Sequence, residues 1–457
     1  GQGDASAPRR EDEGVRMHVE VRATQARDAY PQAGDGRVGS ALSVVALCLA
    51  AVSGCGGGES GGTGGASSTT SSGGSSGFGG GGTGGNDATT STGSLSTGTG
   101  SSTGTGGGGT GGGATQGEPF VYVGGYGNQI HVFRLEVADG SLMPVGSPVD
   151  AGQNPSFLAV SPAHDTLFAV NEDGGGKGSV ASFHIDAKTG ALSFVSRVSS
   201  KGDGPAHVST DKTGKFALVA NYGGGTVAVL PIGAGGVLGE AIDVHAHGGN
   251  ANAHQIITAP SNKFAFVPNK GLNTVTQYAF DPASGKLTGA SQLDVAGGAG
   301  PRHLDFSPTA PFAYLINELD STMSTLSYDA AAGKLTKVQT LSTLPAGFQG
   351  NNTCAEVQVA PSGKFVYGSN RGDDSIVTYS VGSDGKLALV GHQSTMGKTP
   401  RHFQVDASGE FLLVANQGSG NVVTFRVDAA TGALTPTGKS AAVGSPSFVG
   451  VVYLVPN

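Results

Sequence analysis

The chain has 457 residues, a formal net charge of −8 and 81 glycines, and it contains no tryptophan. No basic tract occurs, so nucleic acid is not an expected partner, because binding to a phosphate backbone depends on clustered lysine and arginine. The lack of tryptophan argues against WD-type repeats. Of the three cysteines, only Cys354 lies in the part expected to fold, which leaves no disulfide framework there, and no Cys-x-x-Cys-His sequence marks a c-type haem.

The N-terminal 55 residues carry an apolar run that indicates export. Residues 41–54 (ALSVVALCLAAVSG) are too few to span a bilayer comfortably and are typical of a signal sequence, although the charged stretch before them is unusually long. Small residues directly before Cys55 resemble a bacterial lipoprotein cleavage site, in which this cysteine becomes lipidated; a plain secretory signal is the alternative. We therefore predict residues 1–55 to be an extension with a signal, and the protein to be an exported cell-envelope lipoprotein, in the periplasm or at the outer membrane.

Residues 56–117 consist almost wholly of glycine, serine and threonine. Such a segment has almost no apolar surface to bury, so nothing offsets the conformational entropy that ordering would cost. We predict a disordered linker with an end-to-end distance of about 45 Å as a random coil. It would tether a folded domain, residues 118–457, to a lipid anchor that is the only expected contact with a membrane.

A sequence mark recurs through residues 118–457: a glycine, one further residue and a leucine, usually preceded by an aspartate. The leucines of successive copies lie 46 to 52 residues apart. They are Leu142, Leu192, Leu238, Leu287, Leu335, Leu387 and Leu434. Seven copies at this spacing indicate a repeat architecture.

A hairpin accompanies the marks. Examples are PRHLDFSPTAPFAYLINE (301–318) and PRHFQVDASGEFLLVANQ (400–417), in which an alternating apolar strand, a turn and a second strand end at asparagine. A third strand, the aspartate–glycine turn and a fourth strand complete one propeller blade. We therefore predict an all-β, seven-bladed β-propeller with four antiparallel strands per blade. Pairing of the end strands, 446–454 and 120–126, should close the ring as a monomer.

Polar residues recur where each hairpin opens. Because the two strands are antiparallel, the start of the first lies beside the end of the second, and the blades bring these ends to one mouth of the central channel. Each residue alone is more simply a polar strand end, but arginines gathered at a concave mouth suit an anionic ligand. The residues expected there are Asn171, Glu172, His207, Asn221, Tyr222, His254, Lys270, Arg302, His303, Asn317, Glu318, Glu356, Asn370, Arg371, Arg401, His402 and Gln417.

The hairpins PRHLDFSP and APSGKFVYGSNR resemble those of the seven-bladed lactonase propellers, which include 6-phosphogluconolactonases and fungal carboxymuconate-lactonizing enzymes. The resemblance implies a lactonase-type carboxylic-ester hydrolase that acts on the lactone of a small sugar acid or muconate-like acid. The fungal enzymes are proposed to use a histidine, two arginines and a glutamate. The corresponding catalytic candidates here are His254, Arg302, Glu318 and Arg371.

The resemblance also implies roles for these residues. Arg302 and Arg371 would hold a carboxylate or phosphate and polarise the lactone carbonyl. Glu318 or His254 would take a proton from water or return one to the leaving alkoxide. No metal or other cofactor is expected, because the histidine spacing is not typical of zinc ligands; Ca²⁺ held by carboxylates at the channel mouth is the alternative. The residues expected to bind the substrate are His207, His303, Glu356, Arg401 and His402.

One departure from the family supports a second function. The family commonly has His-x-His where this chain has Asn252-Ala253-His254, so one imidazole is missing. A non-catalytic, envelope-anchored propeller that binds a partner is therefore the alternative. Export also argues against 6-phosphogluconolactone itself, since that compound is made in the cytosol. His245 and His247 are expected to be solvated on an outer strand, and Cys354 to be a buried small residue.

Overall fold

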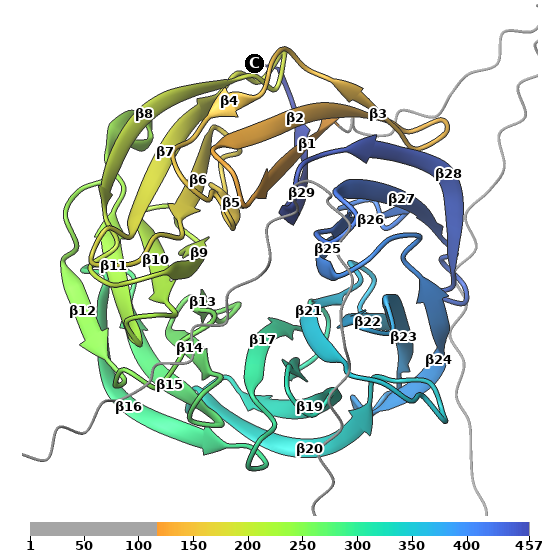
Figure 1. The fold of residues 1–457 in the computed structure, drawn as a ribbon. Helices are drawn as coiled ribbons and strands as arrows, with labels where there is room; N and C mark the ends of the chain where they lie inside the picture. The colour runs from red at the N-terminus through yellow and green to blue at the C-terminus, as the bar shows by residue number, and fades with distance from the viewer. Residues whose placement is uncertain (1–116, 457) are drawn as a thin grey trace, which may run out of the picture. The chain divides into compact units, whose positions relative to one another are not determined.

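The computed structural model describes residues 117–456, which form a ring of blades around a central channel (Figure 1). The predicted signal segment 1–55, with the lipidation site Cys55, and nearly all of the predicted linker 56–117 lie outside the described residues. Within residues 117–456 the strands form seven sheets of four antiparallel strands, the first with one short extra strand. The predicted seven-bladed, all-β architecture is confirmed. No helix in this part of the chain has the length and apolar character needed to cross a membrane.

The blades begin at the channel and run outward. Blade 1 contains β29 (Pro446–Leu454), β1 (Glu118–Gly125), β2 (Gln129–Glu136) and β3 (Ser141–Pro144), with β4 (Val149–Asp150) paired to β2. Blade 2 contains β5 (Leu158–Val160), β6 (Thr166–Asn171), β7 (Ser179–Ile185) and β8 (Leu192–Ser199). Blade 3 contains β9 (Pro205–Thr210), β10 (Phe216–Asn221), β11 (Thr226–Pro231) and β12 (Asp243–Ala246), with the 3₁₀ turn η1 (Ala234–Gly236) before β12.

The other four blades follow the same order. Blade 4 contains β13 (Ile257–Thr258), β14 (Phe264–Asn269), β15 (Thr274–Asp281) and β16 (Lys286–Asp294). Blade 5 contains β17 (Pro301–Phe306), β18 (Phe312–Asn317), β19 (Thr322–Asp329) and β20 (Lys334–Ser342). Blade 6 contains β21 (Thr353–Val359), β22 (Phe365–Arg371), β23 (Ser375–Val381) and β24 (Leu387–Ser394). Blade 7 contains β25 (Pro400–Val405), β26 (Phe411–Asn416), β27 (Asn421–Val427) and β28 (Leu434–Ala442).

The two ends of the described chain close the ring. Strand β29 pairs antiparallel with β1, from Glu118 opposite Leu454 to Gly125 opposite Pro446. The C-terminal strand is therefore the innermost strand of the blade that the N-terminal strand begins, as predicted. Because β1 gains a partner on its channel side, no unpaired edge is left where the chain ends meet.

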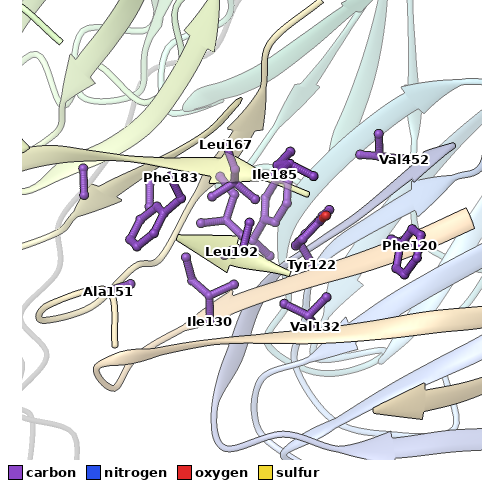
Figure 2. Close-up of a cluster of buried hydrophobic side chains, with 14 of the residues drawn as sticks. Phe120, Tyr122, Ile130, Val132, Ala151, Leu167, Phe183, Ile185, Leu192 and Val452 are labelled. Carbon is purple, nitrogen blue, oxygen red and sulfur yellow. The ribbon is translucent and has the colours of Figure 1, made fainter. Parts of the chain in front are cut away.

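Packing between adjacent blades forms the core. The second strand of each blade lies between two neighbouring blades, and all six residues of β6, β10 and β26 are buried. The outer strands face water on one side, and most residues of β16 are exposed. Figure 2 shows one interblade cluster, in which Phe120 and Tyr122 of blade 1 lie with Leu167, Phe183 and other residues of blade 2.

The glycine of the recurring mark is required by the contact between blades. Gly190 has φ 70°, in the left-handed region that favours glycine. A Cβ atom at Gly190 would lie 2.2 Å from the Phe120 ring of the preceding blade. The Tyr122 hydroxyl also donates to the Gly190 carbonyl at 2.9 Å. The periodic mark therefore reflects a repeated interblade contact.

Candidate active site

The open ends of the hairpins meet at one mouth of the channel, as predicted. Pro301 at the start of β17 pairs with Asn317 at the end of β18, and Pro400 pairs in the same way with Asn416. The asparagines themselves are buried and serve the scaffold. Asn416 Nδ2 donates to the Thr395 carbonyl at 3.0 Å, and Asn370 Nδ2 donates to the Thr343 carbonyl at 2.8 Å. Their side chains thus join the blade to nearby loops.

Residues that follow the asparagines, together with Arg302 at the start of β17, form a charged cluster around Glu318. Lys270 Nζ lies 3.0 Å from Oε1 of Glu318, Arg371 Nη2 lies 3.3 Å from the same oxygen, and Arg302 Nε lies 3.2 Å from Oε2. These cations come from blades 4, 6 and 5. One carboxylate therefore holds three cationic side chains from three blades together.

The charges of this cluster decide which groups can take a proton. Burial alone would raise the pKa of Glu318, but Arg371, Arg302 and Lys270 outweigh it and lower the pKa to about 2. The carboxylate is therefore ionised and a weak base. Arg302 is 3% exposed, and its Nη1 donates to the Ala355 carbonyl at 2.6 Å. Burial and repulsion by Arg371 lower the pKa of the Arg302 guanidinium to about 9, which still leaves it charged at neutral pH.

Below the charged cluster, seven residues at equivalent positions of the seven inner segments meet across the channel. Each lies two residues after the position that proline occupies in most blades. In the neighbouring strand, His207, His303 and His402 pair with the residue just before the asparagine, and Phe448 pairs with Gly124 at the same position of blade 1. We call this set the channel ring. Its members are Phe157, His207, His254, His303, Glu356, His402 and Phe448.

Aromatic contacts hold the channel ring together. The ring of Phe157, from blade 2, lies 4.3 Å from that of His207, 5.8 Å from that of His303 and 5.4 Å from that of His402, measured between centroids. Phe448 lies 4.8 Å from Phe157 and 4.4 Å from His402. Since these residues belong to blades 1, 2, 3, 5 and 7, the channel ring spans the channel.

Hydrogen bonds link three polar members of the channel ring, His254, His303 and Glu356. His303 Nδ1 lies 2.8 Å from Glu356 Oε2, and His254 Nδ1 lies 3.2 Å from His303 Nε2. His402 Nε2 approaches the same oxygen of Glu356 at 3.4 Å. In residues 117–456 no group of three or more histidine, cysteine, aspartate or glutamate side chains is arranged to hold a metal ion. His254, His303 and Glu356 thus form one hydrogen-bonded set.

Burial keeps these imidazoles neutral. Burial and the nearby Arg302 lower the pKa of His207 and of His402 to about 3. The same two causes hold the pKa of His254 and of His303 well below the usual value. Burial acts in the opposite sense on a carboxyl group and raises the pKa of Glu356 to about 8, against the effect of Arg302. At neutral pH the mouth therefore offers uncharged imidazoles beside several cations.

A small cavity of about 10 Å³, with room for roughly one water molecule, lies between the charged cluster and the channel ring. The predicted site residues that line it are His254, Arg302, His303, Arg401 and His402. The remaining predicted residues lie behind this lining. Glu318 pairs with Arg302, and Arg371 pairs in turn with Glu318. Glu356 contacts His303, and His207 contacts Phe157. A larger cavity of about 500 Å³ lies at the hairpin turns, lined by Ser161, His164 and Ala407 among others. It lacks a comparable cluster of charged groups, so the smaller cavity is the better candidate.

Two residues of the mouth, Tyr126 and Phe157, were not predicted from the sequence. Tyr126 was missed: its hydroxyl donates to Glu172 Oε2 at 2.8 Å and accepts from Arg401 Nη2 at 2.7 Å. Burial raises the pKa of this phenol above its usual value. Tyr126 follows the second strand of blade 1 as Glu172 follows that of blade 2, so alignment of the blades would have found it. The same alignment would have found Phe157, because it occupies in blade 2 the position that His207 occupies in blade 3.

Three residues singled out in the sequence, His247, Asn252 and Cys354, have the following surroundings. His247 was expected to be solvated, which is wrong: it is half-buried and lies 2.7 Å from both Asn269 Oδ1 and the Tyr278 hydroxyl. The partner tyrosine comes from another strand, so the local sequence gave no sign of it. Asn252, at the position of the missing histidine, has φ 49°, and its Nδ2 donates to the Tyr222 carbonyl at 3.3 Å. Cys354 is a buried free cysteine, as expected.

Comparisons with known proteins agree with this architecture. The profile of the family described as "Lactonase, 7-bladed beta-propeller" matches residues 120–451. A 6-phosphogluconolactonase of Pectobacterium carotovorum subsp. carotovorum (strain PC1) is 36% identical over 330 residues, which cover 71% of this chain and 96% of that protein. A 6-phosphogluconolactonase of Bacillus subtilis (strain 168) is 32% identical over 291 residues, which cover 62% of this chain and 82% of that protein.

Solved structures give the same relationship. The periplasmic gluconolactonase of Pseudomonas aeruginosa superimposes with a TM-score of 0.69 at 33% identity, covering 74% of this chain and 99% of that one. A protein from Lactobacillus plantarum superimposes with a TM-score of 0.68 at 30% identity, covering 74% and 99%.

Proposed function

The chain belongs to the family of seven-bladed β-propeller lactonases, and on this basis we propose that it hydrolyses the lactone of a small acidic substrate at the channel mouth. The main support is the arrangement of the small cavity, where the neutral imidazole of His254 and the guanidinium groups of Arg302 and Arg401 face the same space. Hydrolysis of a lactone needs a base for water and a positive charge for the carbonyl oxygen, and these groups supply both.

The groups suggest the following reaction. Arg302 polarises the lactone carbonyl, and His254 takes a proton from water as the water oxygen attacks the carbonyl carbon. The carbonyl oxygen becomes negatively charged beside the guanidinium groups. The ring C–O bond then breaks, the leaving alkoxide receives the proton from His254, and a hydroxy acid results. Glu318 holds Arg302, Arg371 and Lys270 in place through its ion pairs with all three.

The charge of the mouth supports an acidic substrate. The cations Lys270, Arg302, Arg371 and Arg401 outnumber the carboxylates Glu172 and Glu318. The raised pKa of Glu356 also favours its neutral form. A sugar acid or a muconate-like acid carries the carboxylate or phosphate that guanidinium groups bind. Substrate binding is part of this proposal: His303, Arg401 and His402 line the cavity and contact the substrate, and His207 and Glu356 support this binding from behind them.

Export as a lipoprotein is a further part of the proposal. The apolar segment before Cys55 supports it, and a structural relative of this chain carries the name periplasmic gluconolactonase. We propose lipidation at Cys55, a linker at 56–117 and a monomeric propeller at 118–457. A propeller outside the cytosol would act on an unphosphorylated sugar lactone.

A panel of lactones tests the function. The full chain is assayed with δ-gluconolactone, 6-phosphogluconolactone and muconolactone by proton release, with the spontaneous hydrolysis subtracted. We expect turnover of at least one lactone, and a large loss in Arg302→Ala but not in Lys439→Ala, whose lysine pairs with Asp139 far from the mouth. If the protein binds gluconate at the mouth yet hydrolyses none of the lactones, it is the non-catalytic binding module instead.

A further inference from the structure

The channel ring contains an unbroken chain of hydrogen bonds from the cavity to a buried carboxyl group. It starts at His254, passes through His303 and ends at Glu356, with separations of 3.2 and 2.8 Å. The three side chains come from the innermost segments of blades 4, 5 and 6, and they are 5%, 1% and 5% exposed. The second nitrogen of His254, Nε2, makes no hydrogen bond to any residue between 117 and 456, and His254 lines the cavity. Water or substrate in the cavity is therefore its available partner.

A backbone contact fixes the polarity at the buried end. The Val449 amide donates to Nδ1 of His402 at 3.4 Å, so a neutral His402 carries its proton on Nε2. That nitrogen lies 3.4 Å from Glu356 Oε2. With Glu356 ionised, the same oxygen accepts from Nδ1 of His303. The Nε2 of His303 is then an acceptor for Nδ1–H of His254, which leaves the lone pair of His254 on Nε2, in a residue that lines the cavity.

We propose that His254, His303 and Glu356 form one proton relay, in which His303 and Glu356 are positioning residues that switch His254 between a base and an acid. The inference rests on the proposed lactonase function. It adds two residues that act through His254 and do not themselves touch the reacting atoms.

The relay moves one proton and balances within a single turnover. In its base form, Glu356 is ionised and His254 Nε2 takes a proton from water while the water oxygen bonds to the lactone carbonyl carbon. His254 passes its Nδ1 proton to His303 Nε2, and His303 passes its Nδ1 proton to Glu356. In the resulting acid form, His254 presents Nε2–H. As the ring C–O bond breaks, this proton goes to the leaving alkoxide, and the reverse shifts restore the base form.

The surroundings of the relay favour transfer of the proton to Glu356 over a positively charged imidazole at His254 or His303. Burial and Arg302 disfavour a positive imidazole at His254 and His303, with further repulsion of His254 by Arg401 and Lys270. His207 and His402 act on His303 in the same sense. At the other end, burial and Asp305 favour the protonated form of Glu356, and Arg302 opposes them. A proton taken up at the cavity is therefore better placed on Glu356 than on an imidazole.

The rate should depend on pH through this relay. The base form requires an ionised carboxylate, and burial raises the pKa of Glu356 to about 8. We expect kcat/KM to rise with pH up to about 8 and then level off. Glu356→Gln preserves the side-chain volume but cannot titrate, so kcat should fall about 100-fold or more, the usual contribution of general acid–base catalysis. This limb of the pH profile should vanish, while KM should change less than threefold.

Two further variants separate the relay from a structural role. Glu356→Asp keeps a titrating group and should restore part of kcat together with the pH limb. His392→Gln is the matched control, because His392 is a half-buried histidine of β24 that bonds only the Thr343 carbonyl among residues 117–456. Wild-type kcat or an unchanged pH profile in a folded Glu356→Gln protein would overturn the proposal. Equal losses in Glu356→Gln and Glu356→Asp, with matching losses of thermal stability, would also overturn it.

Nitrogen NMR of the full chain, labelled at histidine, tests the relay without any substrate. Above pH 8 we expect His254 to be protonated on Nδ1, and below it on Nε2, whereas Glu356→Gln should show one tautomer at all pH values. A His254 tautomer that ignores pH in the wild type refutes the relay. Absence of turnover with every lactone would refute the proposed function instead, and the tautomer measurement would still decide the relay.

Discussion

Replacing Glu318 by glutamine removes the one negative charge that lies among three cations, and its effect on stability can be worked out from the structure. The Glu318 side chain is 10% exposed and its pKa falls from 4.5 to about 2. A difference of about 2.5 pH units, at roughly 1.4 kcal/mol each, corresponds to about 3.5 kcal/mol. We expect Glu318→Gln to lose about this much free energy of unfolding at pH 7.

The loss should itself depend on pH. The folded pKa of Glu318 lies below the unfolded one, so its contribution is fully present above pH 4.5 and disappears as the pH falls towards 2. Urea unfolding of the wild type and of Glu318→Gln at several pH values measures this. The two proteins should differ most at neutral pH and converge in acid. A constant difference at all pH values would refute the ionic role of Glu318.

The same substitution separates binding from proton transfer. Removal of the carboxylate frees the three cations to pair with a bound anion, and a charge-assisted hydrogen bond contributes roughly 1.5–3 kcal/mol. We therefore expect gluconate to bind at least tenfold more tightly to Glu318→Gln by calorimetry, and the pH profile of kcat to keep its shape. Loss of turnover with intact binding would instead make Glu318 the base.

Three other changes test separate parts of the account. Deletion of residues 446–457 removes the partner of β1 and opens the ring, so thermal unfolding of the propeller should lose its cooperativity; a truncated protein with the wild-type transition would contradict this closure. Arg371→Ala should weaken gluconate binding about tenfold, because a charge-assisted hydrogen bond contributes roughly 1.5–3 kcal/mol, and Arg371→Lys should recover part of it; equal losses in both would show that the charge is not what matters. Mass spectrometry of the mature protein should find a lipid-modified N-terminus at Cys55, and a peptide that begins upstream of this residue would disprove lipidation.

The sequence predicted the fold because its periodic mark has a local physical cause. A glycine at positive φ beneath an aromatic ring of the preceding blade, as at Gly190 and Phe120, tolerates no other residue. The end strands also predicted the closure of the ring, because the hairpin of β1 and β2 leaves β1 without a partner on its channel side, and β29 supplies it. The antiparallel hairpins predicted which ends meet at the mouth, and therefore brought His254, Arg302 and Glu318 together correctly.

The details of the mouth depended on distances that no local pattern contains. Successive residues of a strand point in opposite directions, so Asn317 serves the blade while Glu318 reaches its three cations. Alignment of the seven blades would have identified Phe157 as a member of the channel ring. The hydrogen bond between His254 and His303, however, depends on how closely blades 4 and 5 approach across the channel, which is a property of the closed ring.

The turnover number of His254→Asn tests the central claim most directly. Hydrolysis of the best lactone from the panel is followed for wild type and variant, with thermal unfolding as the check that both are folded. If His254 is the group that takes the proton from water, kcat should fall about 100-fold or more while KM stays within threefold. A folded His254→Asn protein that hydrolyses the lactone at the wild-type rate would contradict the assignment of the reaction to this site.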